Sequence, residues 1–268
     1  SLQNRHSRTK TLPKTARNRA FPDGEGGFII AGSRDDGRQS LLLKRAISYS
    51  DLTGAIGGSY ICRMIVVIDY NIGNVRSVCN AFRHIGCDIE LSRDAGTVEN
   101  ARGLVLPGVA AFGYAVNALG SAGELVKRAA AAGKPILGIC VGYQMLFEES
   151  CEYGPHRGLG LIRGNVVALP PAQPVPHMGW NRVELPADMA LFSDLGEAKH
   201  FYFAHSYYAQ PADERVKIAY TDYGFALPAS VQKDNIHGVQ FHPEKSGRQG
   251  LKVLQNFYEM CTRKAAAC

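Results

Sequence analysis

One cysteine of the 268-residue chain lies between two glycines, in the segment KPILGICVGYQMLFEES (134–150). The apolar run Ile136–Ile139 is typical of a short buried strand, and apolar residues recur at roughly helical spacing from Val141 onward. Cys140 is therefore predicted at a corner where a strand gives way to a helix. The glycines on either side leave room for the sharp turn that lifts a nucleophile above a sheet.

A cysteine at such a corner can act as a nucleophile or can simply fill space. The N-terminus of the following helix would favour the thiolate, and the backbone N–H of Val141 would point toward a developing oxyanion. Most buried cysteines serve packing alone. With the G-x-C-x-G pattern, catalysis and packing are equally good interpretations of this cysteine.

A thiol nucleophile needs a group that carries its proton and a third group that orients the carrier. The segment GVQFHPEKS offers His242 and Glu244 two residues apart, so in an extended backbone they would project on the same side. Pro243 would block further ladder pairing between them. Glu244 could accept one imidazole N–H and leave the other nitrogen for Cys140, whereas an isolated H-x-E is more often a surface histidine and a solvated glutamate.

The segment LVLPGVAAFG (104–113) could complete such a site. A strand that ends in Pro-Gly exposes backbone N–H groups at the rim of a sheet, where a second oxyanion donor is needed. One such donor is typically worth about 2.7–4 kcal/mol of transition-state stabilisation. An ordinary Pro-Gly turn explains the same spacing equally well.

The elements that would position these residues alternate between strands and helices of about ten residues, which indicates βαβ units and a mostly parallel sheet. Strands are predicted at 64–69, 88–91, 103–106 and 136–139, with helices at 75–84 and in an Ala-rich stretch that ends at 133. Ligands bind beyond the carboxyl ends of such strands, where Cys140 falls. After Ser150, strand-like segments separated by turn residues indicate antiparallel or mixed pairing, and a last helix from Gly250 to about Met260 returns to the sheet.

Composition narrows the classes of function. The seven cysteines include no C-x-x-C pair, which argues against a disulfide framework or a zinc site and suits a reducing cytoplasm. No apolar run approaches the length of a membrane span. The net charge of +6 resides in residues 1–63, and the rest of the chain carries as many acidic as basic side chains. That larger part shows no charge pattern for nucleic acid or an anionic membrane.

Residues 1–63 differ from the rest. Their first twenty residues are basic, free of acids and poor in apolar side chains, so burial could not offset the entropy of ordering them. Such a composition resembles an organelle transit peptide and would also suit binding to nucleic acid. We expect the domain to begin at Met64 and span 64–262, with 1–63 as a disordered or non-native extension and 263–268 as a tail.

Several segments together resemble the class I glutamine amidotransferases, and more narrowly the glutaminase subunits of imidazole glycerol phosphate synthases of histidine biosynthesis. They are LGICVGYQMLFEES, GLGLIRGNVV, PHMGWNRV, YFAHSYY and GVQFHPEKSGRQGLKVLQNF. The likeness runs from Met64 to about Met260, and PHMGWN and HPEKS are its most specific parts. It implies a flavodoxin-like α/β fold, in which a mixed, mostly parallel sheet is flanked by helices.

The resemblance implies a Cys140–His242–Glu244 triad that needs no cofactor or metal. Cys140 would attack the side-chain amide of glutamine, ammonia would leave through His242, and water would hydrolyse the γ-glutamyl thioester. The implied substrate-binding residues are Gln144, Gly108, Ala110, His205, Ser206 and Tyr207, and the implied oxyanion hole uses Val109 and Val141. Ala110 departs from the family, which usually has glycine there, and alanine would hinder a flip of this loop to positive φ.

The resemblance also implies a partner. The glutaminases of this family dock on a (β/α)8-barrel cyclase, which uses the ammonia to make imidazole glycerol phosphate and aminoimidazole carboxamide ribonucleotide. Lys245 would pair with an acidic residue of the cyclase, Met178 and Trp180 would lie at the interface, and Asn74 would support the oxyanion loop. Two alternatives stay open: another class I glutaminase or γ-glutamyl hydrolase, and a non-catalytic α/β binding module with an inert Cys140.

Overall fold

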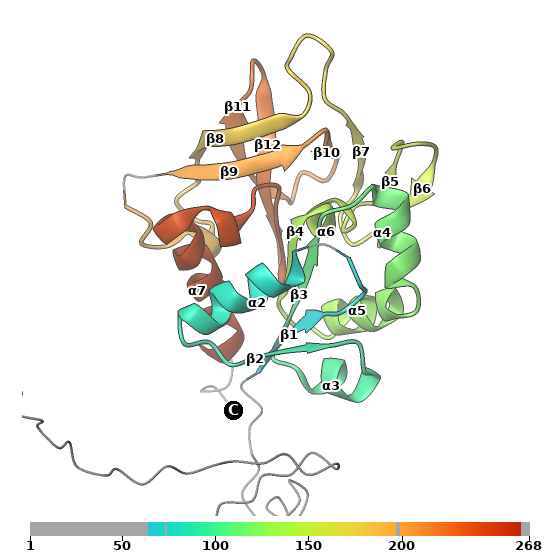
Figure 1. Ribbon diagram of the computed structural model, residues 1–268, viewed down its shortest axis with the longest axis vertical. Helices are drawn as coiled ribbons and strands as arrows, with labels where there is room; N and C mark the ends of the chain where they lie inside the picture. Colours follow the sequence, from blue (N-terminus) through green and yellow to red (C-terminus); the bar gives the residue numbers. More distant parts are fainter. Residues whose placement is uncertain (1–63, 73, 197–198, 264–268) are drawn as a thin grey trace, which may run out of the picture. The chain divides into compact units, whose positions relative to one another are not determined.

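The computed structural model describes residues 64–72, 74–196 and 199–263 (Figure 1). The expectations for residues 1–63, and for the tail beyond Arg263, lie outside the described residues. Among the described helices, none combines the length and the apolar character that crossing a membrane requires.

A mixed sheet of nine strands forms the centre of the described domain, in the order β2-β1-β3-β4-β13-β12-β11-β8-β9. Its first five strands pair in parallel: β2 (Ile89–Ser92), β1 (Ile65–Ile68), β3 (Gly103–Gly108), β4 (Ile136–Cys140) and β13 (Ile236–Val239). The remaining four pair in antiparallel fashion: β12 (Ala226–Lys233), β11 (Lys217–Asp222), β8 (His177–Glu184) and β9 (His200–His205). The predicted α/β class and the change to antiparallel pairing after Ser150 are both confirmed.

A smaller sheet of four strands lies beside the first. Its order is β10 (Tyr207–Pro211), β7 (Gly164–Ala168), β5 (Glu149–Ser150) and β6 (His156–Arg157). Strand β10 follows β9 after a single residue, Ser206, so the chain passes from one sheet to the other next to the predicted substrate-binding residues.

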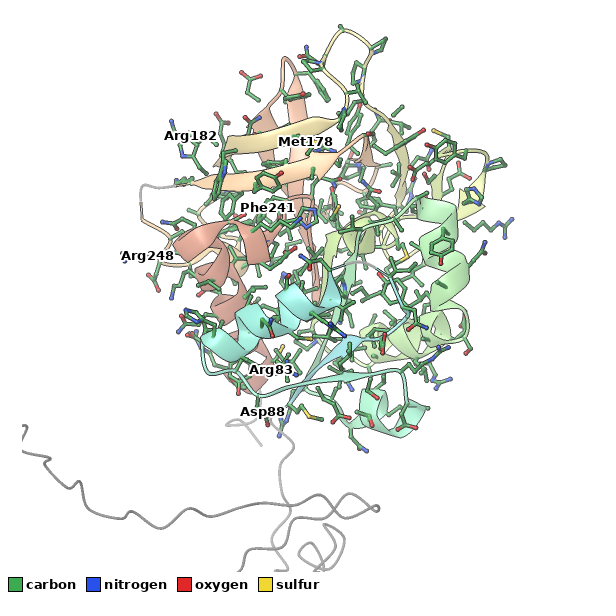
Figure 2. All side chains as sticks on the ribbon, in the orientation of Figure 1. Arg83, Asp88, Met178, Arg182, Phe241 and Arg248 are labelled. Atoms are coloured by element: carbon green, nitrogen blue, oxygen red, sulfur yellow. The ribbon has the colours of Figure 1, made fainter. Side chains whose placement is uncertain are left out.

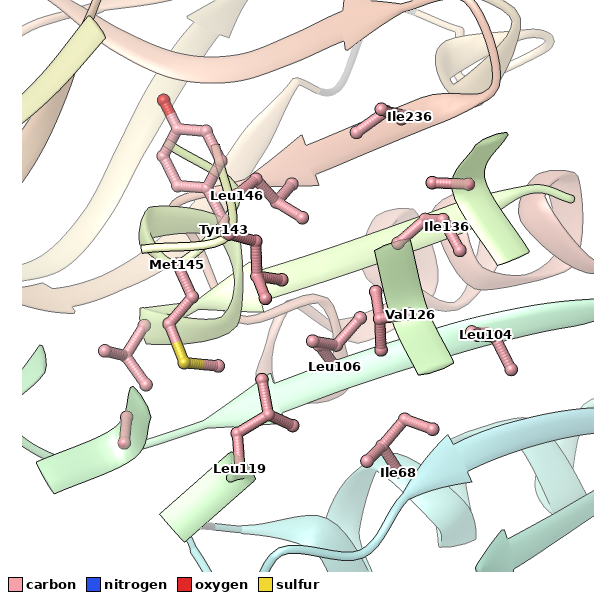
Figure 3. Close-up of a cluster of buried hydrophobic side chains, with 14 of the residues drawn as sticks. Ile68, Leu104, Leu106, Leu119, Val126, Ile136, Tyr143, Met145, Leu146 and Ile236 are labelled. Carbon is pink, nitrogen blue, oxygen red and sulfur yellow. The ribbon is translucent and has the colours of Figure 1, made fainter. Parts of the chain in front are cut away.

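Helices cover both faces of the parallel strands. On one face α2 (Val75–His84) and α7 (Gly247–Arg263) bury an apolar core with Ile65 and Val67, while Val66 and Ile68 face the other core. That second core lies under α3 (Ala95–Asn100), α4 (Phe112–Leu119) and α5 (Ala122–Ala131), and Figure 3 shows part of it. Burial on both faces explains why β1 and β4 are nearly continuous apolar runs, whereas the edge strand β2 is more exposed and more polar.

The structure differs from the sequence prediction at three places in the helices. The Ala-rich stretch forms two helices, α4 and α5, because the chain turns at Gly120 with φ of 49°. Helix α3 was not predicted, and Asp94 caps it by accepting a hydrogen bond from the Thr97 N–H at 2.8 Å. The helix after Cys140, α6, spans only Val141–Gln144.

The shortness of α6 has a local cause. The carbonyl groups of residues 145–147, which would continue the helix, instead accept hydrogen bonds from the N–H groups of residues 159–162. The chain then enters β5 at Glu149. Tertiary pairing has therefore overridden the helical periodicity of the sequence.

Candidate active site

Cys140 lies where the sequence predicted, as the last residue of β4 and directly before α6. Its backbone has φ of 55° and ψ of −114°, a strained conformation for a residue other than glycine. The flanking glycines make this turn possible: a Cβ on Gly142 would lie 1.8 Å from the carbonyl oxygen of Leu106, and one on Gly138 would lie 2.6 Å from that of Gly142. Because α6 is a single turn, its dipole can contribute less to the sulfur than a full helix would.

His242 and Glu244 meet in the interior. The His242 Nδ1 atom lies 2.9 Å from Glu244 Oε1, and both side chains are buried. Contrary to the sequence prediction of an extended segment, Pro243–Lys245 forms a 3₁₀ turn, which folds the carboxylate back against the ring. Hydrogen bonds from His242 N to the Tyr202 oxygen (2.8 Å) and from the Ser246 hydroxyl to the His242 oxygen (2.6 Å) hold this turn in place.

The Cys140 sulfur is one of the groups that determine the pKa of His242. Burial by itself would lower the pKa of His242, but the Cys140 sulfur and the Glu244 carboxylate outweigh burial and raise the pKa to about 10. The buried Nε2 atom has no partner with regular hydrogen-bond geometry among the described residues. The structure therefore brings the sulfur, the imidazole and the carboxylate together, with one ring nitrogen left for proton transfer.

The predicted oxyanion loop lies beside the elbow. Gly108, the last residue of β3, pairs in register with Cys140, and a Cβ there would lie 2.3 Å from Val141 Cγ1. The Tyr70 hydroxyl, which sequence reasoning missed, donates a hydrogen bond to the Pro107 carbonyl and so anchors the start of the loop. Neither Val109 nor Ala110 has a positive φ in this structure.

A cavity of about 370 Å³ opens above Cys140, a size typical of ligand pockets. Its walls contain nine of the predicted site and interface residues: Val109, Ala110, Cys140, Val141, Gln144, Met178, His205, Ser206 and Tyr207. They also contain Glu152 and Tyr153, which sequence reasoning missed. Glu152 Oε2 accepts a hydrogen bond from the Phe112 N–H at 2.7 Å, so this carboxylate fixes the start of α4 at the edge of the cavity.

Tyr207 lines the cavity, and two side chains contact its carbonyl oxygen. It accepts from Gln144 Nε2 at 2.8 Å, and His205 Nδ1 lies 2.9 Å away. A carbonyl only accepts, so Nδ1 of His205 carries the proton, and its Nε2 must accept from His177 Nδ1 at 2.9 Å. Burial lowers the pKa of His205 to about 3 and that of His177 to about 4, so both rings are neutral near pH 7.

The predicted interface residues Met178, Trp180 and Lys245 lie on the surface, and Met178 also lines the cavity. Met178 and Trp180 project from β8 with 64% and 55% of their surface exposed, and Met178 is labelled in Figure 2. Lys245 lies over the Tyr202 ring, with Nζ 5.8 Å from the ring centroid, and Trp180 packs edge-on to the same ring. Exposed apolar side chains gathered in this way are typical of an interaction surface.

Asn74 lies at the start of α2, where its side-chain oxygen accepts a hydrogen bond from the Ser77 hydroxyl. That oxygen therefore serves the beginning of the helix in this structure. No group of three or more His, Cys, Asp or Glu side chains within the described ranges is placed to hold a metal ion.

The comparisons with known proteins concern the same part of the chain. The profile of the family described as glutamine amidotransferase class-I matches residues 66–261. Imidazole glycerol phosphate synthase subunit HisH of Methanothermobacter thermautotrophicus is 49% identical over 197 residues, which cover 74% of this chain and 98% of that relative. The subunit of the same name from Caldanaerobacter subterraneus is 44% identical over 199 residues, with the same coverage.

Solved structures share the fold. The structure of PurLQS from Thermotoga maritima aligns with a TM-score of 0.58 and 21% identity, covering 74% of this chain and 98% of that chain. At this identity the likeness concerns the fold alone. The elbow, the His242–Glu244 pair and the cavity all lie within the matched residues.

Replacing Gly142 by alanine is expected to disrupt the elbow, because the new Cβ would lie 1.8 Å from the Leu106 carbonyl oxygen. Overpacking of a dense core typically costs about 1–3 kcal/mol of unfolding free energy, which urea titration measures. Gly96→Ala, in the exposed helix α3, is the matched control and should leave stability nearly unchanged or slightly higher. Equal stability of the two variants would contradict the close packing described above.

Replacing Glu244 by glutamine is expected to lower the pKa of His242. The neutral amide no longer stabilises the charged imidazole against the effect of burial. The folded-state pKa of about 10 exceeds the ordinary 6.5, so protonation of His242 stabilises the fold below that ordinary value and the contribution is lost as pH rises through 10. The deficit of Glu244→Gln in unfolding free energy should therefore be larger near pH 6 than near about pH 10.

Urea titrations of both chains at the two pH values measure this change. Glu99→Gln, which removes an exposed carboxylate paired with Arg128, is the control and should give a small difference that does not depend on pH. A Glu244→Gln deficit that is the same at both pH values would show that the carboxylate does not control the charge of His242.

Proposed function

The chain belongs to the class I glutamine amidotransferase family, and we propose that within it the chain acts as the glutaminase subunit of an imidazole glycerol phosphate synthase. The observation that carries the chemistry is the strained Cys140 elbow, which lines a cavity and lies beside the buried His242–Glu244 pair. The narrower assignment rests on identities of 44–49% to subunits of that name, along almost their whole length.

The proposed reaction begins with attack of the Cys140 sulfur on the carboxamide carbon of glutamine. His242 takes the thiol proton and returns it to the leaving nitrogen, so ammonia departs and a γ-glutamyl thioester forms. Water then adds to the thioester with His242 as base, releasing glutamate and the thiol. Glu244 holds the imidazole in orientation and stabilises its charged form.

Negative charge develops on the carbonyl oxygen during both steps. We assign its stabilisation to the backbone N–H groups of Val141, at the elbow, and Val109, on the neighbouring loop. Residues 107–110 adjoin the elbow because β3 and β4 pair in parallel as far as Gly108 and Cys140. Asn74 is assigned to support of this loop from the start of α2.

Glutamine fits the chemistry of the cavity walls. Gln144, the loop Gly108–Ala110 and the backbone at 205–207 would hold the substrate, and the Glu152 carboxylate would suit its α-ammonium group. Gln144 is already oriented for this role, since its Nε2 atom is engaged by the Tyr207 carbonyl and its Oε1 atom is the acceptor that remains for substrate.

The partner would be a (β/α)8-barrel cyclase that receives the ammonia. The exposed side chains of Met178 and Trp180 would be covered by it, and Lys245 would pair with one of its acidic residues. The complex would release imidazole glycerol phosphate and aminoimidazole carboxamide ribonucleotide. We place the enzyme in the cytoplasm, where the free cysteines of the described part of the chain would stay reduced, and we assign its catalytic domain to residues 64–262.

Replacing Cys140 by alanine is expected to abolish glutamine-dependent synthesis in the complex with a cyclase, because no thioester can form. Synthesis from free ammonia should persist, since the cyclase site is separate. The full chain and a chain beginning at Met64 should behave alike in this assay, which measures imidazole glycerol phosphate with each nitrogen source. Equal loss with both sources would argue against a separate ammonia-producing site.

Two further results decide between the alternatives. A thiol-reactive glutamine analogue should label Cys140 and leave Cys151, the exposed free cysteine in the described residues, unlabelled. Failure to label Cys140 would support a binding module. Activity with the acceptor subunit of another class I glutaminase, and none with a cyclase, would support a different member of the family.

Replacing Ala110 by glycine is expected to raise glutamine turnover in the complex by up to about tenfold, if a flip of the loop to positive φ limits the rate, because alanine disfavours that conformation by about 1–2 kcal/mol. Ala111→Gly, at the next position in the same cavity wall, is the control and should give little change. No gain in Ala110→Gly would show that the flip does not limit turnover.

A further inference from the structure

We propose that Gln240 is a further functional residue of this site: its side-chain amide donates a hydrogen bond to the Cys140 sulfur while it accepts one from Gln144, and so it aligns the nucleophile with the residue that holds the substrate. The distances are 3.9 Å from Gln240 Nε2 to Cys140 Sγ and 3.0 Å from Gln144 Nε2 to Gln240 Oε1. The inference rests on the proposed role of Cys140 as the nucleophile.

The position of Gln240 is set by the central sheet. It follows the last residue of β13, and its backbone N–H still donates to the Ala229 carbonyl on β12 at 2.8 Å. Alternation along this segment sends Val239 and Phe241 into the core under α2 and α7. Gln240 therefore faces the opposite side, like His242, and both reach the elbow.

Complete burial makes the contacts of this amide informative. Gln240 has no exposed surface, and a buried amide is tolerated only where its polar atoms are hydrogen-bonded. A methionine of the same length, or a leucine of similar volume, would fill the space without that cost. The amide thus has a specific use at this position.

The orientation of the amide follows from its neighbours. The Tyr207 carbonyl can only accept, so the Gln144 atom that contacts it must be the NH₂ group. The same NH₂ group contacts Gln240, whose facing atom must then be the oxygen. This leaves the NH₂ group of Gln240 directed at the sulfur, and no other assignment satisfies all three contacts.

A donor aimed at sulfur favours the thiolate over the thiol, because hydrogen bonds to an ionised acceptor are the stronger ones. The donor also restrains the position of the sulfur, since the Gln240 backbone is fixed by the sheet. When the thioester forms, the sulfur loses its negative charge and the bond weakens. Gln240 would therefore act chiefly before and during the attack on the substrate.

The test measures the rate of Cys140 alkylation by iodoacetamide as a function of pH in the full chain. Gln240→Met keeps the length of the side chain and removes the donor, so the midpoint of the alkylation profile should move upward by about half a pH unit or more. Gln240→Glu, which is isosteric and places an acceptor near the sulfur, should move it further in the same direction. Glutamine turnover, measured as kcat/KM, should fall by about three- to tenfold in Gln240→Met.

Ser230→Ala is the matched control. In the parent chain the Ser230 hydroxyl is also fully buried. It donates from β12 to the Gly238 carbonyl of β13 at 2.8 Å and does not contact the Cys140 sulfur. The substitution should lower stability while the alkylation profile stays that of the parent. Circular dichroism and urea titration identify any variant that fails to fold, and either Gln240 variant suffices for the comparison.

An unchanged alkylation midpoint in a folded Gln240→Met or Gln240→Glu chain would overturn the inference and leave Gln240 as a packing residue. Failure of the proposed function has a different signature. The parent chain would then release no glutamate with any partner, whereas alkylation of Cys140 and its dependence on Gln240 could still be measured.

Discussion

The left-handed backbone of Cys140 is the constraint on which the whole site depends. A residue with a Cβ adopts the combination of φ 55° and ψ −114° only where its surroundings enforce it. Here the enforcement is steric, because β3, β4 and α6 approach so closely that Gly108, Gly138 and Gly142 have no space for a Cβ. The same close approach brings residues 107–108, part of the loop proposed to form the oxyanion hole, into register with Ile139 and Cys140, so the strain at one residue and the assembly of the site have a common cause.

The strand order explains how residues far apart in sequence meet at this elbow. Strands β3, β4 and β13 are neighbours and run parallel, so the segments that follow them emerge at one edge of the sheet. Gly108, Cys140 and Gln240 lie at or directly after these three carboxyl ends. The 95 residues between Cys140 and the start of β13 include the antiparallel half of the sheet and return the chain to the site. The cavity is therefore walled by both halves of the domain.

Much of this arrangement was predictable from the sequence, and the exceptions share a reason. The strand before Cys140 and the amphipathic helix α2 follow from local periodicity and were predicted closely. The length of α6 and the turn between His242 and Glu244 depend on hydrogen bonds to distant segments, such as residues 159–162 and Tyr202, and no local pattern contains them. Gln240 was missed although the period of two from His242 placed it on the same side of the strand. Glu152 could not have been found, because its partner lies forty residues earlier.

Strand β8 serves two purposes with adjacent residues. His177 points inward and pairs across the ladder with His205, whereas Met178 points outward and contributes to the exposed apolar surface. Side chains alternate strictly along a strand, so a shift of one residue would exchange these two environments. An insertion or deletion within β8 would therefore disturb the histidine pair and the exposed apolar surface together, and the connection that follows is anchored as well, since Leu191 and Phe192 are buried in the core.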